Sequence, residues 1–121
     1  MDAPVPQYAT EADLARIAQF NRTDAPFPEG VTVQELIEAQ VEAHASRTAV
    51  ICDHDTAFGV TSLTYAELNE KANQVAHFLR AEGVRPGEVV ALIVERSFAM
   101  IIGVLGIIKA GGTYVPLDPE Y

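Results

Sequence analysis

Residues 89–117 read VVALIVERSFAMIIGVLGIIKAGGTYVPL and contain the pattern that decides the fold. Residues 89–94 are six apolar residues in a row, which is typical of a strand that is covered on both faces. Residues 98–109 are apolar nearly all round, so they favour a helix buried inside a larger body. A Gly-Gly pair ends that helix, and residues 113–117 form the next strand. The stretch therefore predicts a right-handed βαβ unit with parallel strands.

The apolar helix carries several local signals. Ser97 can cap its start, and Lys109 favours its C-terminus electrostatically. Gly103 and Gly106 each cost about 1 kcal/mol of helix stability relative to Ala. We expect close approach of another element to offset that cost.

Two capping boxes lie upstream. Thr64 and Glu67, within the phrase LTYAEL at residues 63–68, predict a helix start, with the helix running over residues 65–82. Its expected buried face consists of Leu68, Ala72, Val75, Ala76 and Leu79. His77 is expected on the solvent side, and Gly83 is a natural left-handed stop.

Thr32 and Glu35 form the other capping box, at the start of an amphipathic helix. Residues at helical spacing on its apolar side are Val33, Leu36, Ile37, Gln40, Val41 and His44. Glu35, Glu38 and Glu42 are interpreted as a solvated face.

The remaining pattern sets the domain organisation. Residues 49–52 and 61–65 are predicted as the two strands of a β-hairpin around a long polar turn region, residues 53–62. Residues 1–31 are expected to form a flexible arm (1–9), a short helix capped by Thr10 and a linker (21–31). Residues 32–121 form the α/β part, whose last strand leaves an edge open to pairing or aggregation.

Composition restricts the classes of function. The chain has 121 residues, is 49% hydrophobic and carries a net charge of −9, which is ordinary for a folded domain and unfavourable for binding nucleic acid. Its longest apolar run, residues 98–108, is too short for a membrane span, which needs about 20 residues. The N-terminus lacks the features of a signal peptide, and the single cysteine, Cys52, indicates a reducing, cytoplasmic setting.

Several phrases together resemble the adenylation domains of nonribosomal peptide synthetases. The matching phrases, in the family's order, are Phe20–Thr23, residues 32–36, Thr48–Val50, residues 63–69 (the first core motif), Glu95–Ser97 and Ile108–Tyr121 (the second core motif). The resemblance covers the chain from about Thr10 to Tyr121. Two departures are the length of the 53–62 region and Thr113, where the family often has Ala.

The resemblance implies a partial N-terminal subdomain of an adenylate-forming enzyme. The parent domain would use ATP and Mg²⁺ to convert an amino acid to aminoacyl-AMP for a carrier protein, and would follow a condensation domain. The family's catalytic motifs lie beyond Tyr121, so we assign no catalytic, cofactor-binding or metal-binding residue and expect the fragment alone to be inactive. The two core motifs present have an architectural interpretation, as a helix cap and a helix-to-strand corner.

Other interpretations stay open on the residues alone. The first is a non-catalytic or self-associating module that pairs through its strand edge; the second is a small nucleotide-binding α/β protein. Cys52, His54 and Asp55 with His44 could be imagined as a metal site, but no set of four ligands is evident. Asp53 invites comparison with a receiver-domain aspartate, yet such a domain needs more parallel strands than this chain offers.

Overall fold

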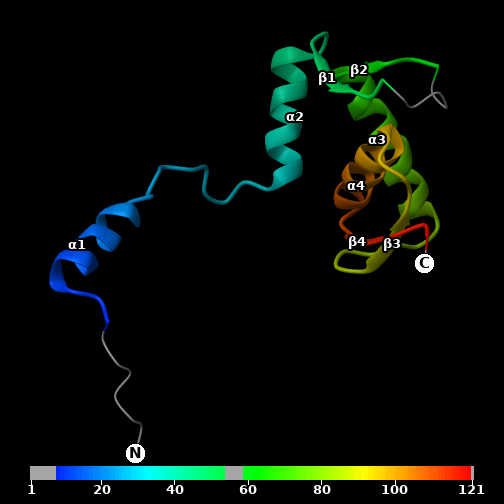
Figure 1. Cartoon of the computed structure of the whole chain (residues 1–121). Helices are drawn as coiled ribbons and strands as arrows, with labels where there is room; N and C mark the ends of the chain where they lie inside the picture. Colours follow the sequence, from blue (N-terminus) through cyan, green and yellow to red (C-terminus); the bar gives the residue numbers. More distant parts are fainter. Residues whose placement is uncertain (1–7, 54–58, 121) are drawn as a thin grey trace, which may run out of the picture. The chain divides into compact units, whose positions relative to one another are not determined.

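The computed structural model describes residues 8–53 and 59–120. The first seven residues of the predicted arm and residues 54–58 of the predicted turn region, which include His54 and Asp55, lie outside the described residues. The chain divides into two compact units, Met1–Gly30 and Val31–Tyr121. The elements follow in the order α1 (Glu11–Phe20), α2 (Val33–His44), β1 (Thr48–Ile51), β2 (Ser62–Thr64), α3 (Tyr65–Ala81), β3 (Val89–Ile93), α4 (Phe98–Ala110) and β4 (Thr113–Leu117), as Figure 1 shows.

Helix α1 belongs to the first unit and has the predicted start. The Thr10 hydroxyl accepts a hydrogen bond from the Asp13 N–H at 3.2 Å, and the Thr10 N–H donates to the Asp13 carboxylate at 2.9 Å. No residue of the helix is buried, and the apolar residues Leu14, Ile17 and Ala18, which recur at helical spacing, are exposed. The helix is therefore specified locally, by its cap, within its unit.

Helices α2 and α3 of the second unit begin in the same way. The Thr32 hydroxyl accepts a hydrogen bond from the Glu35 N–H, and the Thr64 hydroxyl accepts one from the Glu67 N–H. In each pair the glutamate carboxylate accepts a hydrogen bond from the backbone N–H of the threonine. Both predicted capping boxes are thus confirmed. Ser97 differs from its prediction, because its hydroxyl donates to the Glu95 carbonyl oxygen at 3.1 Å and does not cap α4.

The core of the second unit lies where α3 and α4 pack side by side (Figure 1). Its buried residues come from both helices and from the ends of the first sheet: Cys52, Leu63, Leu68, Phe98 and Ile102 form one cluster, and Ala72, Ala76, Ile107 and Ala110 are buried as well. The predicted buried face of α3 is confirmed, with Val75 and Leu79 half-buried.

The glycines of α4 allow the close approach that the sequence predicted. A Cβ atom on Gly106 would lie 2.5 Å from Val75 Cγ1 and 3.2 Å from the Ala72 carbonyl oxygen, both on α3. A Cβ atom on Gly103 would lie 2.7 Å from Leu92 Cδ1 on β3. Alanine at either position would overlap its neighbour, so the two glycines let α3 and β3 pack directly against the α4 backbone.

The strands form two small sheets. Strands β1 and β2 pair antiparallel, as the predicted hairpin requires, with an irregularity between Thr48 and Val50. Strands β3 and β4 pair parallel, from Val89 opposite Thr113 to Ile93 opposite Leu117. The parallel pairing of the predicted βαβ unit is therefore confirmed.

The expectation that β3 is covered on both faces is wrong for the described residues. Val89 is 68% exposed and Ile93 is 59% exposed, whereas Val90 and Leu92 between them are half-buried. The alternation arises because successive side chains of a strand point to opposite faces and α4 covers only one face of this sheet. The other face presents apolar side chains to solvent.

Candidate functional site

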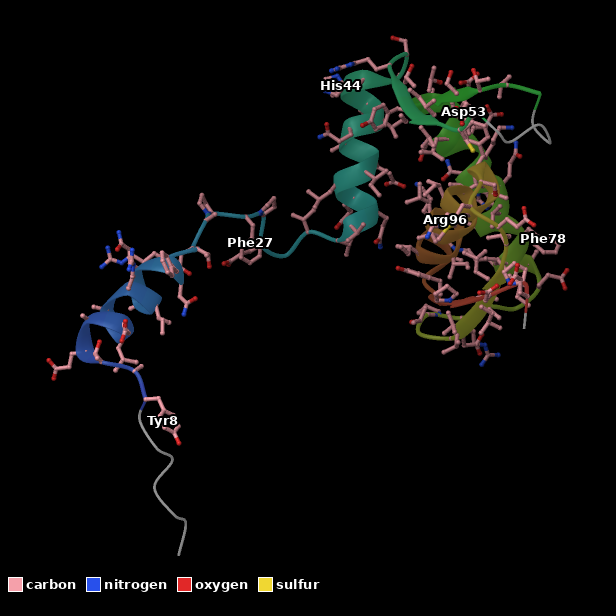
Figure 2. The ribbon with its side chains drawn as sticks, in the orientation of Figure 1. Tyr8, Phe27, His44, Asp53, Phe78 and Arg96 are labelled. Atoms are coloured by element: carbon pink, nitrogen blue, oxygen red, sulfur yellow. The ribbon has the colours of Figure 1, made fainter. Side chains whose placement is uncertain are left out.

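The carboxyl ends of β3 and β4 border a hollow of about 510 Å³. Ligands of open α/β sheets bind at this edge, so it is the first place to look for a site. The charged residues of its lining are Glu95, Arg96, Asp118 and Glu120, and its apolar residues include Met100 and Leu117. Arg96 is labelled in Figure 2. With three carboxylates against one guanidinium, the hollow repels a triphosphate more than it attracts one.

The described residues do not supply a set that fits ATP or Mg²⁺. Gly111 and Gly112 follow α4 and lead into β4, whereas a phosphate loop leads into a helix, where N–H groups point at the anion. Within residues 8–53 and 59–120, no group of three or more His, Cys, Asp or Glu could hold a metal ion. We therefore derive no catalytic step through either group.

The metal site that the sequence left open gains no support from the described residues, and the strand before Asp53 lies in a two-stranded antiparallel sheet, unlike the parallel sheet of a receiver domain. Cys52 is buried in the apolar cluster with Leu63, Leu68, Phe98 and Ile102. It lies at the end of the first sheet, where its thiol contributes to packing. His44 is half-buried at the end of α2, and the two remaining imagined ligands, His54 and Asp55, lie outside the described residues.

A second hollow, of about 280 Å³, has a polar lining drawn from three helices. Its lining residues are Gln34 and Glu38 of α2, Asn73, Ala76, His77 and Arg80 of α3, and Lys109 of α4. His77 is exposed, as predicted, and forms part of this lining.

Lys109 has a different role from the one predicted. Its side chain is only 6% exposed and forms an ion pair with Glu38, so it does more than complement the end of α4. Glu38, in turn, is no simple solvated residue, although its side chain is half-exposed. The available signal was a single charged residue inside an otherwise apolar helix, because such a charge needs a partner.

The fold lowers the pKa of the glutamates that cap α2 and α3. The Thr64 N–H and hydroxyl both donate to Glu67 and hold the pKa of that carboxyl below its usual value. The Thr32 hydroxyl and N–H lower the pKa of Glu35 in the same way. Both carboxylates are exposed, and each is engaged in hydrogen bonds at a helix start.

Comparison with known proteins fits this architecture. Residues 37–121 match the model of the family described as AMP-binding enzyme. The chain belongs to the AMP-binding enzyme family. It corresponds within that family to the N-terminal part of the adenylation domain of nonribosomal peptide synthetases, as the order of its motifs indicates.

The relatives are far longer than this chain. Bacitracin synthase 1 of Bacillus licheniformis is 46% identical over 111 residues, which is 92% of this chain and 2% of that protein. The crystal structure of the nonribosomal peptide synthetase FmoA3 is similar with a TM-score of 0.80 and 32% identity, over 99% of this chain and 12% of that one. The N-terminal subdomain of Klebsiella oxytoca NpsA is similar over 74% of this chain and 22% of its own, with a TM-score of 0.64 and 27% identity.

The family's first two core motifs have structural roles in this chain. Residues 63–69 end β2 and cap α3 through Thr64 and Glu67. Residues 108–121 contain the end of α4, the left-handed Gly111 and strand β4. Within the described part of the chain, no helix is both long and apolar enough to cross a membrane.

Proposed function

We propose that this chain is an architectural segment of an amino-acid-activating enzyme. In this proposal residues 32–121 are the N-terminal part of an adenylation domain, and residues 1–31 are the arm, short helix and linker that connect it to an upstream condensation domain. The parent domain converts an amino acid and ATP to aminoacyl-AMP and pyrophosphate, with Mg²⁺, and loads a carrier protein in the cytoplasm. No catalytic, cofactor-binding or metal-binding residue is assigned to the chain itself.

The observation that carries the proposal is the βαβ unit, whose helix α4 covers one face of the sheet while the other face is exposed. Val89 and Ile93 on β3, and Val115 and Leu117 on β4, are exposed apolar residues on a sheet of two strands. An apolar sheet face of this kind is normally covered by another layer of the domain. We propose that the remainder of the adenylation domain covers this face. The exposed face therefore favours the interpretation of the chain as a segment of a larger domain over that of an independent interaction module.

The charges that the described residues place beside β3 and β4 support the proposal that the chain alone is inactive. Stabilising the charge that develops during adenylation requires preorganised donors or cations. The hollow beside β3 and β4 carries an excess of carboxylates, and the Lys109 ammonium is already paired with Glu38.

Amino-acid-dependent exchange between ATP and pyrophosphate tests this proposal. The assay is run on the chain alone and on the chain mixed with a protein that supplies the rest of an adenylation domain. We expect no exchange by the chain alone and measurable exchange in the mixture. Exchange by the chain alone would contradict the assignment of no catalytic residue, and silence in the mixture would contradict the role of a complementing segment.

Two phenylalanines provide a matched control for the mixture. Phe98 is fully buried in the core, whereas Phe78 is 62% exposed on α3 (Figure 2). Phe98→Ala should abolish complementation because it removes the centre of the core, and Phe78→Ala should preserve it. Full complementation by the Phe98→Ala variant would show that exchange in the mixture does not depend on this fold.

A further inference from the structure

The polar hollow between α2, α3 and α4 contains a chain of contacts that the function above does not require. The Lys109 ammonium donates to Glu38 Oε1, which joins α4 to α2. Arg80 Nη2 donates to the backbone carbonyl oxygen of Lys109, which joins α3 to α4. One residue, Lys109, is thus held by its side chain on one side and by its main chain on the other.

Apart from this pair of contacts, helix α2 is held by the hydrogen bond that the Ala66 N–H of α3 donates to the carbonyl oxygen of its C-cap residue Ala45, at 3.0 Å, and by modest apolar packing. None of its residues is buried, and Val33 and Leu36, both expected on its apolar side, are exposed. Its inward residues Ile37, Val41 and His44 are only half-buried. Because hydrophobic stabilisation scales with the apolar area removed from water, α2 gains less from burial than α3 does.

Lys109 and Glu38 differ in how much each depends on the other, because the Lys109 side chain is 6% exposed and the Glu38 side chain is 51% exposed. The Lys109 charge therefore has little contact with bulk water and depends on the carboxylate for compensation. Glu38 is half-exposed, so water can solvate it when the lysine is absent. Removing Glu38 leaves a buried charge without its partner, whereas removing Lys109 leaves an exposed charge, and the first change costs more.

The contact from Arg80 acts at the end of α4. The last carbonyl groups of a helix have no partner within the helix. Arg80 satisfies that of Lys109, and the chain then turns through Gly111, whose φ is 89°, into β4. Arg80 therefore adds a side-chain contact at the end of α4, beside the hydrogen bonds that the Gly111 and Gly112 N–H groups donate back into the helix.

We propose that Glu38, Arg80 and Lys109 form an ionic clamp that fastens α2 to the α3–α4 pair and fixes the corner from α4 into β4. The clamp adds a charged contact to the apolar contacts of α2, whose inward residues are only half-buried. It also makes the attachment of α2 depend on one carboxylate, while the α3–α4 core depends on close packing. This proposal concerns the fold of the chain and does not rest on the proposed enzymatic role of the parent domain.

Amide hydrogen exchange, resolved along the 121-residue chain, tests the clamp. The variants are Glu38→Gln, Lys109→Met, the double variant, and Glu42→Gln as a matched control one turn further along the exposed side of α2. We expect Glu38→Gln to accelerate amide exchange in α2 about tenfold or more, because the substitution leaves the buried charge of Lys109 without its partner. Glu42→Gln should leave α2 unchanged.

The double variant separates the clamp from general damage. Glu38→Gln could also accelerate amide exchange in α3. In that case, adding Lys109→Met should restore protection in α3, because no buried charge then lacks a partner. Amide exchange in α2 should stay fast in the double variant. Equal effects of Glu38→Gln and Glu42→Gln would overturn the proposal. Independent, additive effects of Glu38→Gln and Lys109→Met would overturn it as well.

Discussion

Helices α2 and α3 begin alike and pack differently. Each starts with a threonine and a glutamate that exchange hydrogen bonds across the first turn, and each carries apolar residues at helical spacing. Helix α3 buries Leu68, Ala72 and Ala76, whereas α2 buries no residue and meets α4 through an ion pair. A helix start is therefore a local property of the sequence, while burial depends on what the helix meets.

The difference lies in the partner surface. Helix α3 faces the backbone of α4, where Gly106 lets Val75 and Ala72 come close. Helix α2 meets a polar hollow lined by Arg80 and Lys109. Close packing lets α3 gain from dispersion and from apolar burial together, whereas α2 buries no residue and pairs one charge with α4.

The largest expected effect comes from a matched pair of leucines. Leu68 of α3 is 6% exposed and Leu36 of α2 is 41% exposed. Leu68→Ala should lower the free energy of unfolding by about 2–5 kcal/mol because it leaves a cavity in the core. Leu36→Ala should cost well under about 1 kcal/mol. Urea unfolding of both variants measures the difference, and similar losses would erase the contrast between the helices.

The next effect concerns the two glycines of α4. Gly106→Ala places a methyl group against Val75 Cβ, at 2.6 Å, and against the α3 backbone, so overpacking should cost about 1–3 kcal/mol. Gly103→Ala meets only the movable end of Leu92, and the gain in helix propensity offsets much of its cost. The Gly106→Ala variant should have a clearly lower Tm in thermal unfolding than the Gly103→Ala variant. The reverse order would mean that α3 does not lie against Gly106.

A smaller effect is expected from the caps. Thr64→Ala removes the cap of α3 and should lower the free energy of unfolding by about 1 kcal/mol. Thr32→Ala removes the equivalent cap of α2, which should fray α2 and change global unfolding less. Urea unfolding together with the exchange rates of α2 amides distinguishes the two. A larger global loss from Thr32→Ala would show that α2 belongs to the cooperative core.

The smallest effect is a dependence on pH. The folded state lowers the pKa of Glu35 and Glu67 below the ordinary value of 4.5, through hydrogen bonds from their capping threonines. The stabilisation is therefore fully present above pH 4.5 and is lost as the pH falls through the lowered folded-state values. Titration of the carboxyl groups by NMR measures the pKa values of Glu35 and Glu67. The Glu67→Gln substitution should remove the part of the pH dependence of stability that comes from Glu67. A carboxyl that titrates at or above its ordinary value would contradict the capping geometry.

Much of the fold could be predicted because its signals are local. The three capping boxes mark the starts of α1, α2 and α3, and the predicted strand 113–117 coincides with β4. The two glycines in α4 indicated a close neighbour, although they did not identify Val75 or Leu92. These features depend on residues a few positions apart, or on what a missing side chain permits.

The features that could not be predicted depend on distant residues. The partner of Lys109 is Glu38, 71 positions away, and no local pattern links them. Ser97 follows an extended segment at a helix start, yet its hydroxyl bonds to Glu95. The exposed face of β3 follows from the number of layers around the sheet, which a run of apolar residues cannot specify.

Hydrogen exchange along the unmodified chain at neutral pH tests the central claim most directly. That claim is that the stability of this adenylation-domain segment resides in the α3–α4 pair and that α2 is attached to it. We expect the slowest exchange in α3 and α4, faster exchange in α2, and the fastest helical exchange in α1, all of whose residues are exposed. Exchange in α2 as slow as in α3, or equal rates in all four helices, would contradict the claim.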